Sequence, residues 1–208
     1  MLETLNHSAV LKRTLDYAVG IPLFVVALPV IGLLALLIRL ISPGSPFFVQ
    51  EREGLHGRPI YIWKLRTMYV DADARLKRYL DEHPERAEEW RTIYKLDNDP
   101  RVLPWIGTFF RKSSLDELPN LWNLIRGDIG LVGPRPFPMY HVADFDPTFR
   151  ALRITVRPGL TGIWQLRRGG IEAQTTYDTD YIQNWSNSRD LSLLFQTIPV
   201  MIQGKALF

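Results

Sequence analysis

The chain has 208 residues, 46% of them hydrophobic and 23% charged, which are the proportions of a globular protein with one domain of ordinary size. Its 25 basic and 22 acidic residues give a net charge of +3, too small and too dispersed for a nucleic-acid-binding protein, so we expect no nucleic-acid partner. The chain has no cysteine, which excludes disulfides, thiolate metal sites and cysteine nucleophiles. Its four histidines lack ligand-like spacing, so any metal should be a hard cation held by oxygen atoms, which points to Mg²⁺.

An uncharged apolar run, residues 17–38, lies between Asp16 and Arg39. As a helix it would reach roughly 30 Å, about the thickness of a bilayer core. A cleaved signal peptide is the weaker interpretation, because Asp16 precedes the run and no small-residue cleavage site follows it. Pro29 removes a backbone hydrogen bond near the middle and predicts a bend, and basic residues flank both ends. These features fit a re-entrant helix and a kinked transmembrane helix equally well.

Residues 42–46, Ser-Pro-Gly-Ser-Pro, end this helix, so the sequence predicts a membrane part, residues 1–41, followed by a polar domain, residues 42–208. Two β-rich runs flank the short segment Gly-Leu-His-Gly and predict a β-hairpin. Lys64 and Arg66 share one face of the second strand. For an isolated pair of this kind, a solvated strand face is the more common explanation.

Residues 71–95 are rich in charge with helical spacing, and Pro84 divides them into two short helices or a helix and a turn. Residues 95–101 form a turn-rich loop. In the last segment, apolar side chains share one helical face that should pack on the domain or lie at the membrane surface; they are Leu191, Leu194, Ile198 and Met201. The predicted fold class is therefore α+β and mostly helical, with a membrane helix, a β-hairpin and amphipathic helices at the interface.

Asp116 and Glu117 lie at a predicted helix start, closely preceded by Arg111 and Lys112. Ser114 and Glu117 match a capping box, and aspartate is itself a favoured cap residue. From this segment alone, capping is the better interpretation and catalysis the second. A helix beginning at Ser114 would, however, place Pro119 where its missing N–H is needed.

Arg135 stands between Pro134 and Pro136, in an extended, stiff segment that follows Gly133. A fixed guanidinium offers planar, bidentate donors that suit a phosphate group. A structural proline loop with an exposed arginine is an equally good interpretation, and Arg157, beside a second glycine turn, shares the ambiguity. Together, a membrane anchor, two adjacent carboxylates and arginines in rigid loops fit phosphoryl transfer at a lipid surface.

The sequence strongly resembles the bacterial sugar transferases, also called monotopic phosphoglycosyl transferases, over nearly its whole length. The resemblance runs in order through LKRTLDYAVG with the proline-containing apolar helix, SPGSPFFVQEREG, YIWKLRTM, KLDNDPRV, RKSSLDELPNLWNLIRGDIGLVGPRP and RPGLTGIWQ. It implies a re-entrant helix bent at Pro29, with both ends on the cytoplasmic face of the bacterial inner membrane. It also implies assembly of exopolysaccharide or another glycan, and it is compatible with a homo-oligomer.

The resemblance further implies that Asp116 is a nucleophile toward the β-phosphate of a UDP-sugar. UMP would leave, and undecaprenyl phosphate would then take the sugar-phosphate from Asp116 in a ping-pong sequence. Mg²⁺ would bridge Asp116, Glu117 and the diphosphate, and Glu117 would hold the metal or assist the acceptor. Arg111 and Arg135 match phosphate-binding arginines, Lys64 lies in the basic strand motif, and Arg157 corresponds more weakly.

The segments KLDNDPRV and LPNLW are most similar to enzymes that load glucose-1-phosphate or galactose-1-phosphate, so UDP-glucose and UDP-galactose are the expected donors. The continuation LRRGGIEAQ departs from the usual pattern and leaves the sugar open. Many relatives begin with a long membrane region without a counterpart here, which suggests a natural short form or a truncated chain. The competing function is a non-catalytic membrane module that binds lipid phosphate or recruits a partner.

Overall fold

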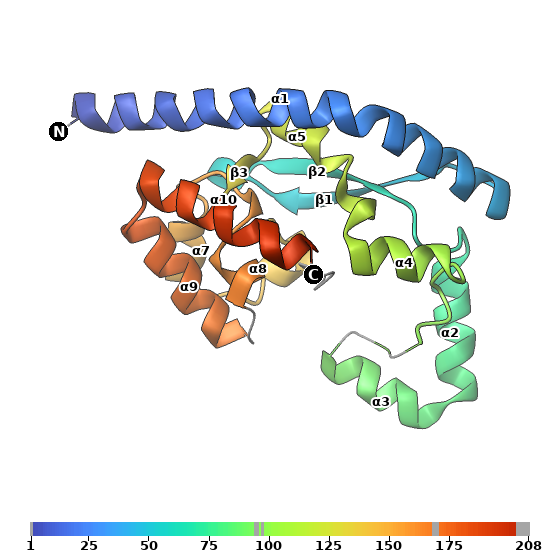
Figure 1. The fold of residues 1–208 in the computed structure, drawn as a ribbon. Helices are drawn as coiled ribbons and strands as arrows, with labels where there is room; N and C mark the ends of the chain where they lie inside the picture. Colours follow the sequence, from blue (N-terminus) through green and yellow to red (C-terminus); the bar gives the residue numbers. More distant parts are fainter. Residues whose placement is uncertain (1, 94–95, 97, 168–170, 203–208) are drawn as a thin grey trace.

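The structure, a computed structural model, describes residues 2–93, 96, 98–167 and 171–202. Most of its elements are helices, with four short strands and two single 3₁₀ turns, here marked η (Figure 1). In chain order they are α1 (Leu2–Ile41), β1 (Phe47–Glu53), η1 (Leu55–Gly57), β2 (Pro59–Leu65), α2 (Ala72–Glu82), α3 (Pro84–Ile93), α4 (Ile106–Ser113), η2 (Leu115–Glu117), α5 (Asn120–Arg126), β3 (Gly130–Val132), α6 (Met139–Val142), α7 (Pro147–Arg153), β4 (Gly159–Thr161), α8 (Ile163–Arg167), α9 (Ile171–Gln183) and α10 (Asn187–Ile202).

Helix α1 lies lengthwise along the rest of the molecule and contacts α5, β2, β3 and α10 (Figure 1). It is continuous over 40 residues although Pro22 and Pro29 both lie inside it, and it curves toward the domain at its C-terminal end. The predicted bend at Pro29 therefore takes the form of a gentle curve without an interruption of the helix. From residue 9 to Ile41 it is long and apolar enough to cross a membrane.

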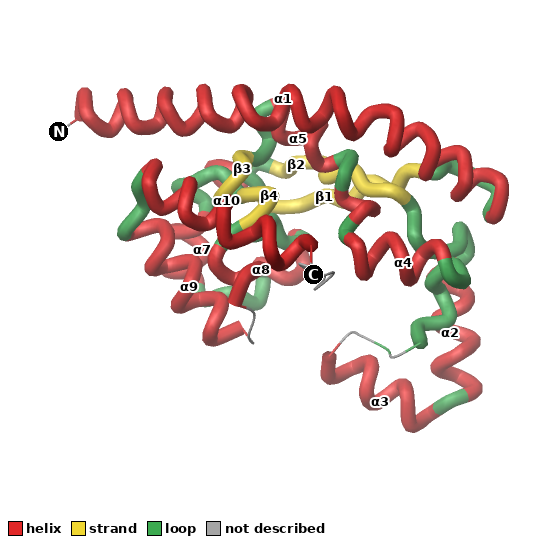
Figure 2. The backbone as a smooth tube through the Cα atoms, in the orientation of Figure 1, coloured by secondary structure: helices red, strands yellow, loops and turns green. Residues whose placement is uncertain are grey.

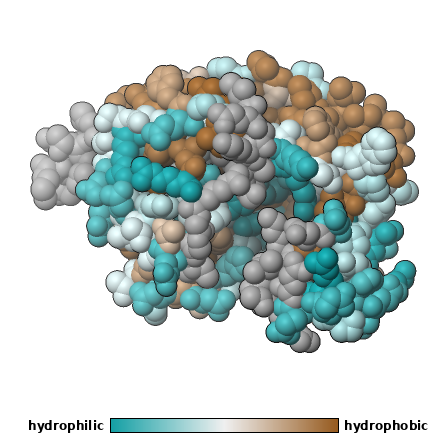
Figure 3. Space-filling model, turned by 60° about the horizontal axis from the view of Figure 1, so that its bottom comes forward, coloured by the Kyte–Doolittle hydropathy of each residue, from teal (hydrophilic) through white to brown (hydrophobic). Residues whose placement is uncertain are grey.

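One stripe of α1 is buried, and most of the other described apolar side chains of this helix are exposed. The buried stripe has helical spacing and consists of Ala27, Ile31, Leu34 and Ile38. Side chains on the other faces, such as Val26 and Leu40, are 71% and 73% exposed. Figure 3 shows this hydrophobic surface along one edge of the molecule. An uncharged apolar helix face of this size indicates a membrane-associated protein.

Polar contacts hold both ends of α1 to the domain. Near the N-terminal end, the Lys12 ammonium pairs with Asp190 of α10, and Asp16 Oδ1 accepts a 2.9 Å hydrogen bond from the backbone N–H of Leu131. At the C-terminal end, the Arg66 guanidinium donates a 2.6 Å hydrogen bond to the carbonyl oxygen of Ser42. At the N-terminal end, charged residues of α1 thus bind the polar domain, and at the C-terminal end Arg66 binds the first residue after the helix.

The predicted β-hairpin is confirmed: β1 and β2 pair antiparallel, with Phe47 opposite Leu65, and η1 forms the turn (Figure 2). A second sheet consists of the short parallel strands β3 and β4, in which Gly130 lies opposite Gly159. One hydrophobic cluster joins β2, β3 and α5 to α9 and α10, and a second joins α1 to β2, α4 and α5. The hairpin therefore lies between the membrane helix and the C-terminal helices.

The charge-rich segment forms two helices, α2 and α3, separated at Pro84 as predicted, and these project away from α1 (Figure 1). Residues 94, 95 and 97, in the predicted turn-rich loop, lie outside the described residues. Of the apolar face predicted for α10, Leu194 packs partly buried against the hydrophobic cluster, whereas Leu191 and Ile198 are exposed. The fully buried side chains of this helix include Leu193 and Thr197. Contact of the exposed part with the membrane surface stays a prediction. Met201 of that face lies outside the side chains that the structure describes.

Candidate active site

A pocket lies where the hairpin, the η2–α5 segment and the loops after β3 and β4 meet. Its floor is apolar, with Ile62 of β2 and Ile129 before β3. Its polar lining is strongly cationic for so small a space, and consists of Arg52, Lys64, Glu117, Asn120, Arg135 and Gln165. The pocket thus gathers three of the predicted site residues from distant parts of the chain, and the carboxylate pair lies at its edge.

Asp116 and Glu117 are both buried in the single 3₁₀ turn η2 between α4 and α5. The predicted capping box is wrong. Ser114 has left-handed backbone dihedrals, with φ of 57°, its side chain makes no capping bond, and the helix that follows begins only at Asn120. Pro119, with φ of −62°, stands just before that helix, where its missing N–H has no cost. Burial without a capping role leaves these carboxylates available for chemistry.

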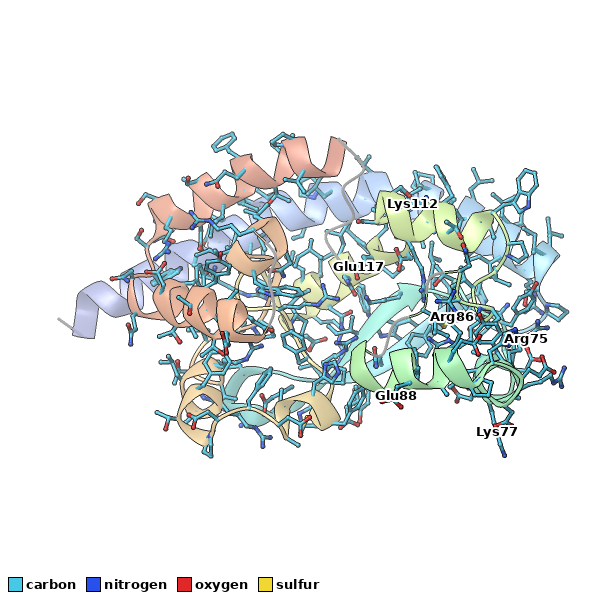
Figure 4. All side chains as sticks on the ribbon, turned by 90° about the horizontal axis from the view of Figure 1, so that it is seen from below. Arg75, Lys77, Arg86, Glu88, Lys112 and Glu117 are labelled. Carbon is cyan, nitrogen blue, oxygen red and sulfur yellow. The ribbon has the colours of Figure 1, made fainter. Side chains whose placement is uncertain are left out.

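Glu117 is held by side-chain contacts on both of its oxygens. The Lys64 ammonium pairs with Glu117 Oε1, and the Asn120 amide nitrogen donates to Oε2 at 3.3 Å. The solvated strand face considered for Lys64 is therefore wrong, because Lys64 points inward. Figure 4 shows Glu117 in the interior of the molecule, well apart from the charged residues of α2 and α3. These contacts fix the position of Glu117.

Asp116 differs from its neighbour because its Oδ1 is buried without a hydrogen-bond partner. Burial, and next the adjacent Glu117 carboxylate, raise the pKa of Asp116 from 3.8 to about 6, while Lys64 and Arg111 act in the opposite direction. At neutral pH the carboxylate is therefore mostly ionised, poorly solvated and free to react. Such a group is the better nucleophile of the pair.

Arg111 reaches Asp116 from the last turn of α4. Its Nε donates a 2.9 Å hydrogen bond to Thr67 Oγ1, which orients the guanidinium beside the carboxylate. Lys112, the next residue, is exposed and lies away from Glu117 (Figure 4). Of the two cations that precede the carboxylates in the sequence, the structure brings only Arg111 to them.

The loop after β3 is held in place by two arginines from other elements. Arg52 donates a 3.1 Å hydrogen bond to the carbonyl oxygen of Pro136, and Arg153 donates one of 2.6 Å to that of Arg135. Gly133 is needed for space, because a Cβ there would lie 2.5 Å from the Arg157 carbonyl oxygen. The loop therefore presents the Arg135 guanidinium to the pocket from a rigid backbone, near both carboxylates.

Arg52 supplies a second guanidinium to the pocket, and nothing in the sequence alone predicts it as a site residue. Burial, and then the positive charge of Arg135, lower the pKa of Arg52 to about 10. Its Nε is buried without a hydrogen-bond partner. Two guanidiniums that repel each other in a partly buried pocket favour an anion between them.

Arg157, in contrast, is not brought to this group. Its Nε donates a 3.1 Å hydrogen bond to the carbonyl oxygen of Gly127, which ends α5 with a left-handed φ of 87°. The side chain is exposed and does not line the pocket. Its position corresponds to a cation that closes the C-terminus of a helix.

Mg²⁺ would find two carboxylates here, and the described residues include no cluster of three or more acidic or histidine side chains that could hold a metal. The unpartnered Oδ1 of Asp116 is a free anionic ligand next to Glu117. Mg²⁺ is typically bound by one or two carboxylates and completes its shell with water and substrate phosphates. The residues present fit that mode of binding.

Three pocket residues, Arg52, Asn120 and Gln165, carry no separate signal in the sequence. Arg52 appears there only as a charge after the apolar run, and Gln165 only as the end of a family motif. Asn120 lies three residues after Glu117, so its contact follows from local geometry. Gln165 reaches the pocket through the pairing of β3 with β4, which are distant in the sequence, and Arg52 reaches it because the hairpin packs against the loop after β3.

The family model described as bacterial sugar transferase matches residues 7–204. The chain is 38% identical over 193 residues to the exopolysaccharide production protein ExoY of Sinorhizobium fredii, covering 91% of this chain and 84% of that protein. It is 40% identical over 202 residues to a UDP-glucose:undecaprenyl-phosphate glucose-1-phosphate transferase of Caulobacter vibrioides, covering 92% of this chain and 69% of the relative.

An undecaprenyl-phosphate galactose phosphotransferase of Salmonella typhimurium is 34% identical, over 95% of this chain but only 42% of its own length. The chain thus spans less than half of some longer relatives and most of ExoY. The family match covers nearly all of the chain and includes both carboxylates and all the pocket residues described above. The chain belongs to the bacterial sugar transferase family, and it is an enzyme of that family.

Proposed function

We propose that this enzyme transfers hexose-1-phosphate from a UDP-hexose to undecaprenyl phosphate and releases UMP. The observation that carries the proposal is a buried, unpartnered carboxylate oxygen on Asp116, beside Glu117 and a pocket lined by Arg52, Lys64 and Arg135. The names of the Caulobacter and Salmonella relatives describe the same type of reaction, with glucose and galactose respectively.

In the first step, an Asp116 carboxylate oxygen attacks the β-phosphorus of the donor. A bond forms between that oxygen and phosphorus, and the bond from phosphorus to the bridging oxygen breaks, so that the electron pair leaves on UMP. In the second step, a phosphate oxygen of undecaprenyl phosphate attacks the same phosphorus and releases the carboxylate of Asp116. The first step requires an ionised, poorly solvated Asp116, and the burial of its unpartnered oxygen supports that requirement. In the second step the same carboxylate is the leaving group and departs as an anion.

The cationic residues stabilise the charge that moves over the phosphate oxygens during both steps. Arg135 and Arg52 approach from the pocket, and Arg111 approaches Asp116 from α4. Glu117 is held by Lys64 and Asn120, which suits a fixed negative charge that orients its neighbours. Asp116 and Glu117 would hold Mg²⁺, which would neutralise charge on the diphosphate when bound.

For the membrane, we propose that α1 is re-entrant and that the domain lies on the cytoplasmic face of the bacterial inner membrane. The support comes from contacts at its two ends. The polar domain binds α1 through Lys12 and Asp16 near one end. Near the other end Ile38 is buried in a cluster with Leu65, and Arg66 binds Ser42 directly after the helix, so one domain on one side of the bilayer contacts both ends. A helix that crosses the bilayer would separate these contacts by the hydrocarbon core.

Release of UMP tests the reaction. Purified enzyme with Mg²⁺, undecaprenyl phosphate and a panel of UDP-hexoses should release UMP, most rapidly from UDP-glucose or UDP-galactose. Asp116→Asn should abolish release while the protein stays folded. Lys112→Gln, an exposed change close in sequence, should leave the rate unchanged. Full activity in Asp116→Asn would rule out Asp116 as the nucleophile.

The covalent step has its own test. Intact-mass analysis after incubation with UDP-hexose and Mg²⁺ alone should show an adduct of one hexose-phosphate, missing in Asp116→Asn. If UMP release requires undecaprenyl phosphate and no adduct forms, the lipid phosphate attacks the donor directly.

Single cysteines test the topology, and the chain has no natural cysteine that would interfere. Val10 and Ser45 are exposed and lie on either side of the apolar run. Val10→Cys and Ser45→Cys should both react with an impermeant maleimide from the cytoplasmic side of sealed vesicles. Labelling from opposite sides would rule out a re-entrant helix.

A further inference from the structure

Gln165 is a buried amide in the pocket that no step of the proposed reaction uses. Its side chain lines the pocket, and the residue is only 1% exposed. Neither its Nε2 nor its Oε1 has a hydrogen-bond partner. Since both atoms lack a partner, the conclusion does not depend on which way the amide is turned. A buried amide with no hydrogen bond costs stability, so a donor and an acceptor at this position call for a ligand that satisfies both.

The parallel strands explain how Gln165 comes to face the same space as Arg135. Strands β3 and β4 end side by side at Val132 and Thr161. Arg135 follows the first strand, and Gln165 lies in α8, directly after the second. Ligands typically bind outside the carboxyl ends of parallel strands, where the loops that follow them meet.

Close packing fixes this edge. A Cβ on Gly162 would lie 2.3 Å from the carbonyl oxygen of Gly133, so the two loops touch without side chains between them. Gln165 is therefore carried on a backbone that cannot easily shift relative to the Arg135 loop, and a ligand that binds one loop lies within reach of the other.

The chemistry of the amide distinguishes among the parts of the donor. Ionised phosphate oxygens are acceptors only, so a phosphate could satisfy Nε2 and would leave Oε1 unpaired. Hydroxyl groups donate and accept, so a sugar satisfies both atoms. Asn120 adds a second acceptor, because its Oδ1 is also buried without a partner while its amide nitrogen binds Glu117.

We propose that Gln165, assisted by Asn120, binds hydroxyl groups of the donor hexose and so determines which hexose is transferred. This inference rests on the proposed transfer reaction. Gln165 lines the same pocket as Glu117, the neighbour of Asp116. The phosphate that Asp116 attacks is the one that carries the hexose, so the hexose lies closer to this pocket than the ribose does.

The test compares UDP-hexoses that lack one hydroxyl with the complete donor, using UMP release as the readout. In the wild-type enzyme, at least one deoxy donor should lose about 10-fold to 100-fold in kcat/KM, because the amide is then left unpaired. In Gln165→Met, which keeps the length of the side chain, kcat/KM for the complete donor should fall by a similar factor. In that variant, kcat/KM for the deoxy donor should be almost the same as kcat/KM for the complete donor. If Gln165 had only a structural role, the variant would lower kcat/KM for both donors by the same factor.

A second readout separates the hexose from the nucleotide. Inhibition by UMP, which has a ribose and no hexose, should be unchanged in Gln165→Met. Weaker inhibition by UMP would place Gln165 on the nucleotide and overturn the proposal. Gln196→Leu is the control, because Gln196 is an exposed glutamine of α10, and it should change none of these values.

The outcomes also separate this inference from the proposed function. If the wild-type enzyme releases no UMP from any UDP-hexose, the transfer reaction itself is wrong. If it releases UMP but accepts every deoxy donor as well as the complete one, only the role of Gln165 is wrong. That last comparison uses the unaltered protein, so it holds even if a variant fails to fold.

Discussion

The Arg153 guanidinium donates a 2.6 Å hydrogen bond to the backbone carbonyl oxygen of Arg135 and so fixes the loop that carries a pocket arginine. The same guanidinium pairs with Asp178 of α9, and both side chains are buried, 6% and 4% exposed. The rings of Phe137, Phe145 and Phe149 surround it at 5.1 to 5.6 Å. Arg153 touches no substrate group in the proposed reaction, so we assign it a positioning role.

Arg153→Met should therefore affect stability and substrate binding separately. It leaves Asp178 buried without its cation, which should lower the free energy of unfolding by about 3 to 5 kcal/mol. It also frees the Arg135 loop, which should raise KM for the UDP-hexose more than it lowers kcat. Chemical denaturation and steady-state kinetics measure the two effects.

The double variant Arg153→Met with Asp178→Leu is the control for stability. It removes both buried charges, so it should recover much of the lost stability. KM should stay high, because the hydrogen bond to the Arg135 carbonyl oxygen is still missing. Recovery of KM together with stability would contradict the positioning role.

The raised pKa of Asp116 makes a prediction about stability and pH. Its pKa rises from 3.8 to about 6 in the folded protein, chiefly through burial, so the folded state holds this proton more tightly than the unfolded state. Between these values stability should fall as pH rises, by at most about 3 kcal/mol. Asp116→Asn removes this penalty and should be more stable than the wild type at pH 8.

Thermal unfolding in detergent with EDTA, at pH 4 and pH 8, measures this difference. The stabilisation by Asp116→Asn should be largest at pH 8 and much smaller at pH 4, where the folded state keeps its proton and the unfolded state, with a pKa of 3.8, is already partly protonated. A variant that is equally stabilised at both pH values would contradict the pKa argument. UMP release by the wild type should fall as pH drops through about 6, because the nucleophile gains a proton.

Lys64 and Glu117 form an ion pair whose side chains are 16% and 7% exposed. Lys64→Met leaves Glu117 buried without its cation, and it should lower the free energy of unfolding by about 3 kcal/mol. It should also reduce UMP release strongly, because Glu117 is then held by Asn120 alone among its described contacts.

Arg75→Met is the matched comparison for Lys64→Met, since Arg75 pairs with Asp71 on the surface of α2, where the side chains are 39% and 59% exposed. An exposed pair should contribute little to stability, and UMP release should not change. Denaturation curves and initial rates distinguish the two variants. Equal losses in both would mean that the pocket ion pair is as well solvated as a surface pair.

Local sequence predicted the elements whose signals lie within one segment. The membrane helix follows from an uninterrupted apolar run, and the hairpin follows from a turn between two β-rich strands. The helix cap at Ser114 was wrong because the chain turns left-handed there and makes a separate 3₁₀ turn. Spacing alone could not identify Leu193 as the fully buried leucine of α10, because leucines occur on more than one of its faces.

The pocket could be predicted only in part. Asp116, Glu117 and Arg111 are close in the sequence, and a helix end followed by a turn brings them together. Arg52 meets the Arg135 loop only because the hairpin packs against residues more than 80 positions later, and Gln165 meets it only because β3 pairs with β4. Contacts between segments so distant in the sequence leave no local signal. Arg157 was predicted as a site residue but does not line the pocket, because its side chain binds the end of α5.

Two glycines of α1 test whether this helix packs lengthwise on the domain. A Cβ on Gly20 would lie 1.9 Å from Leu124 Cδ2 of α5, whereas a Cβ on Gly32 would meet nothing within 4 Å. Gly20→Ala should therefore force α1 and α5 apart and lower the free energy of unfolding by about 1 to 3 kcal/mol. Gly32→Ala should be neutral or add about 0.5 to 1 kcal/mol, because alanine is the better helix former.

Both substitutions add the same methyl group to the same helix, so helix propensity and hydrophobicity change equally, and a difference in stability reports contact with the domain. Thermal unfolding in detergent, followed by tryptophan fluorescence, measures it. Because α5 begins three residues after Glu117, Gly20→Ala should also slow UMP release, while Gly32→Ala should not. If Gly20→Ala were as stable as Gly32→Ala, α1 would not rest on α5, and the argument that one polar domain holds both ends of the helix would lose its support.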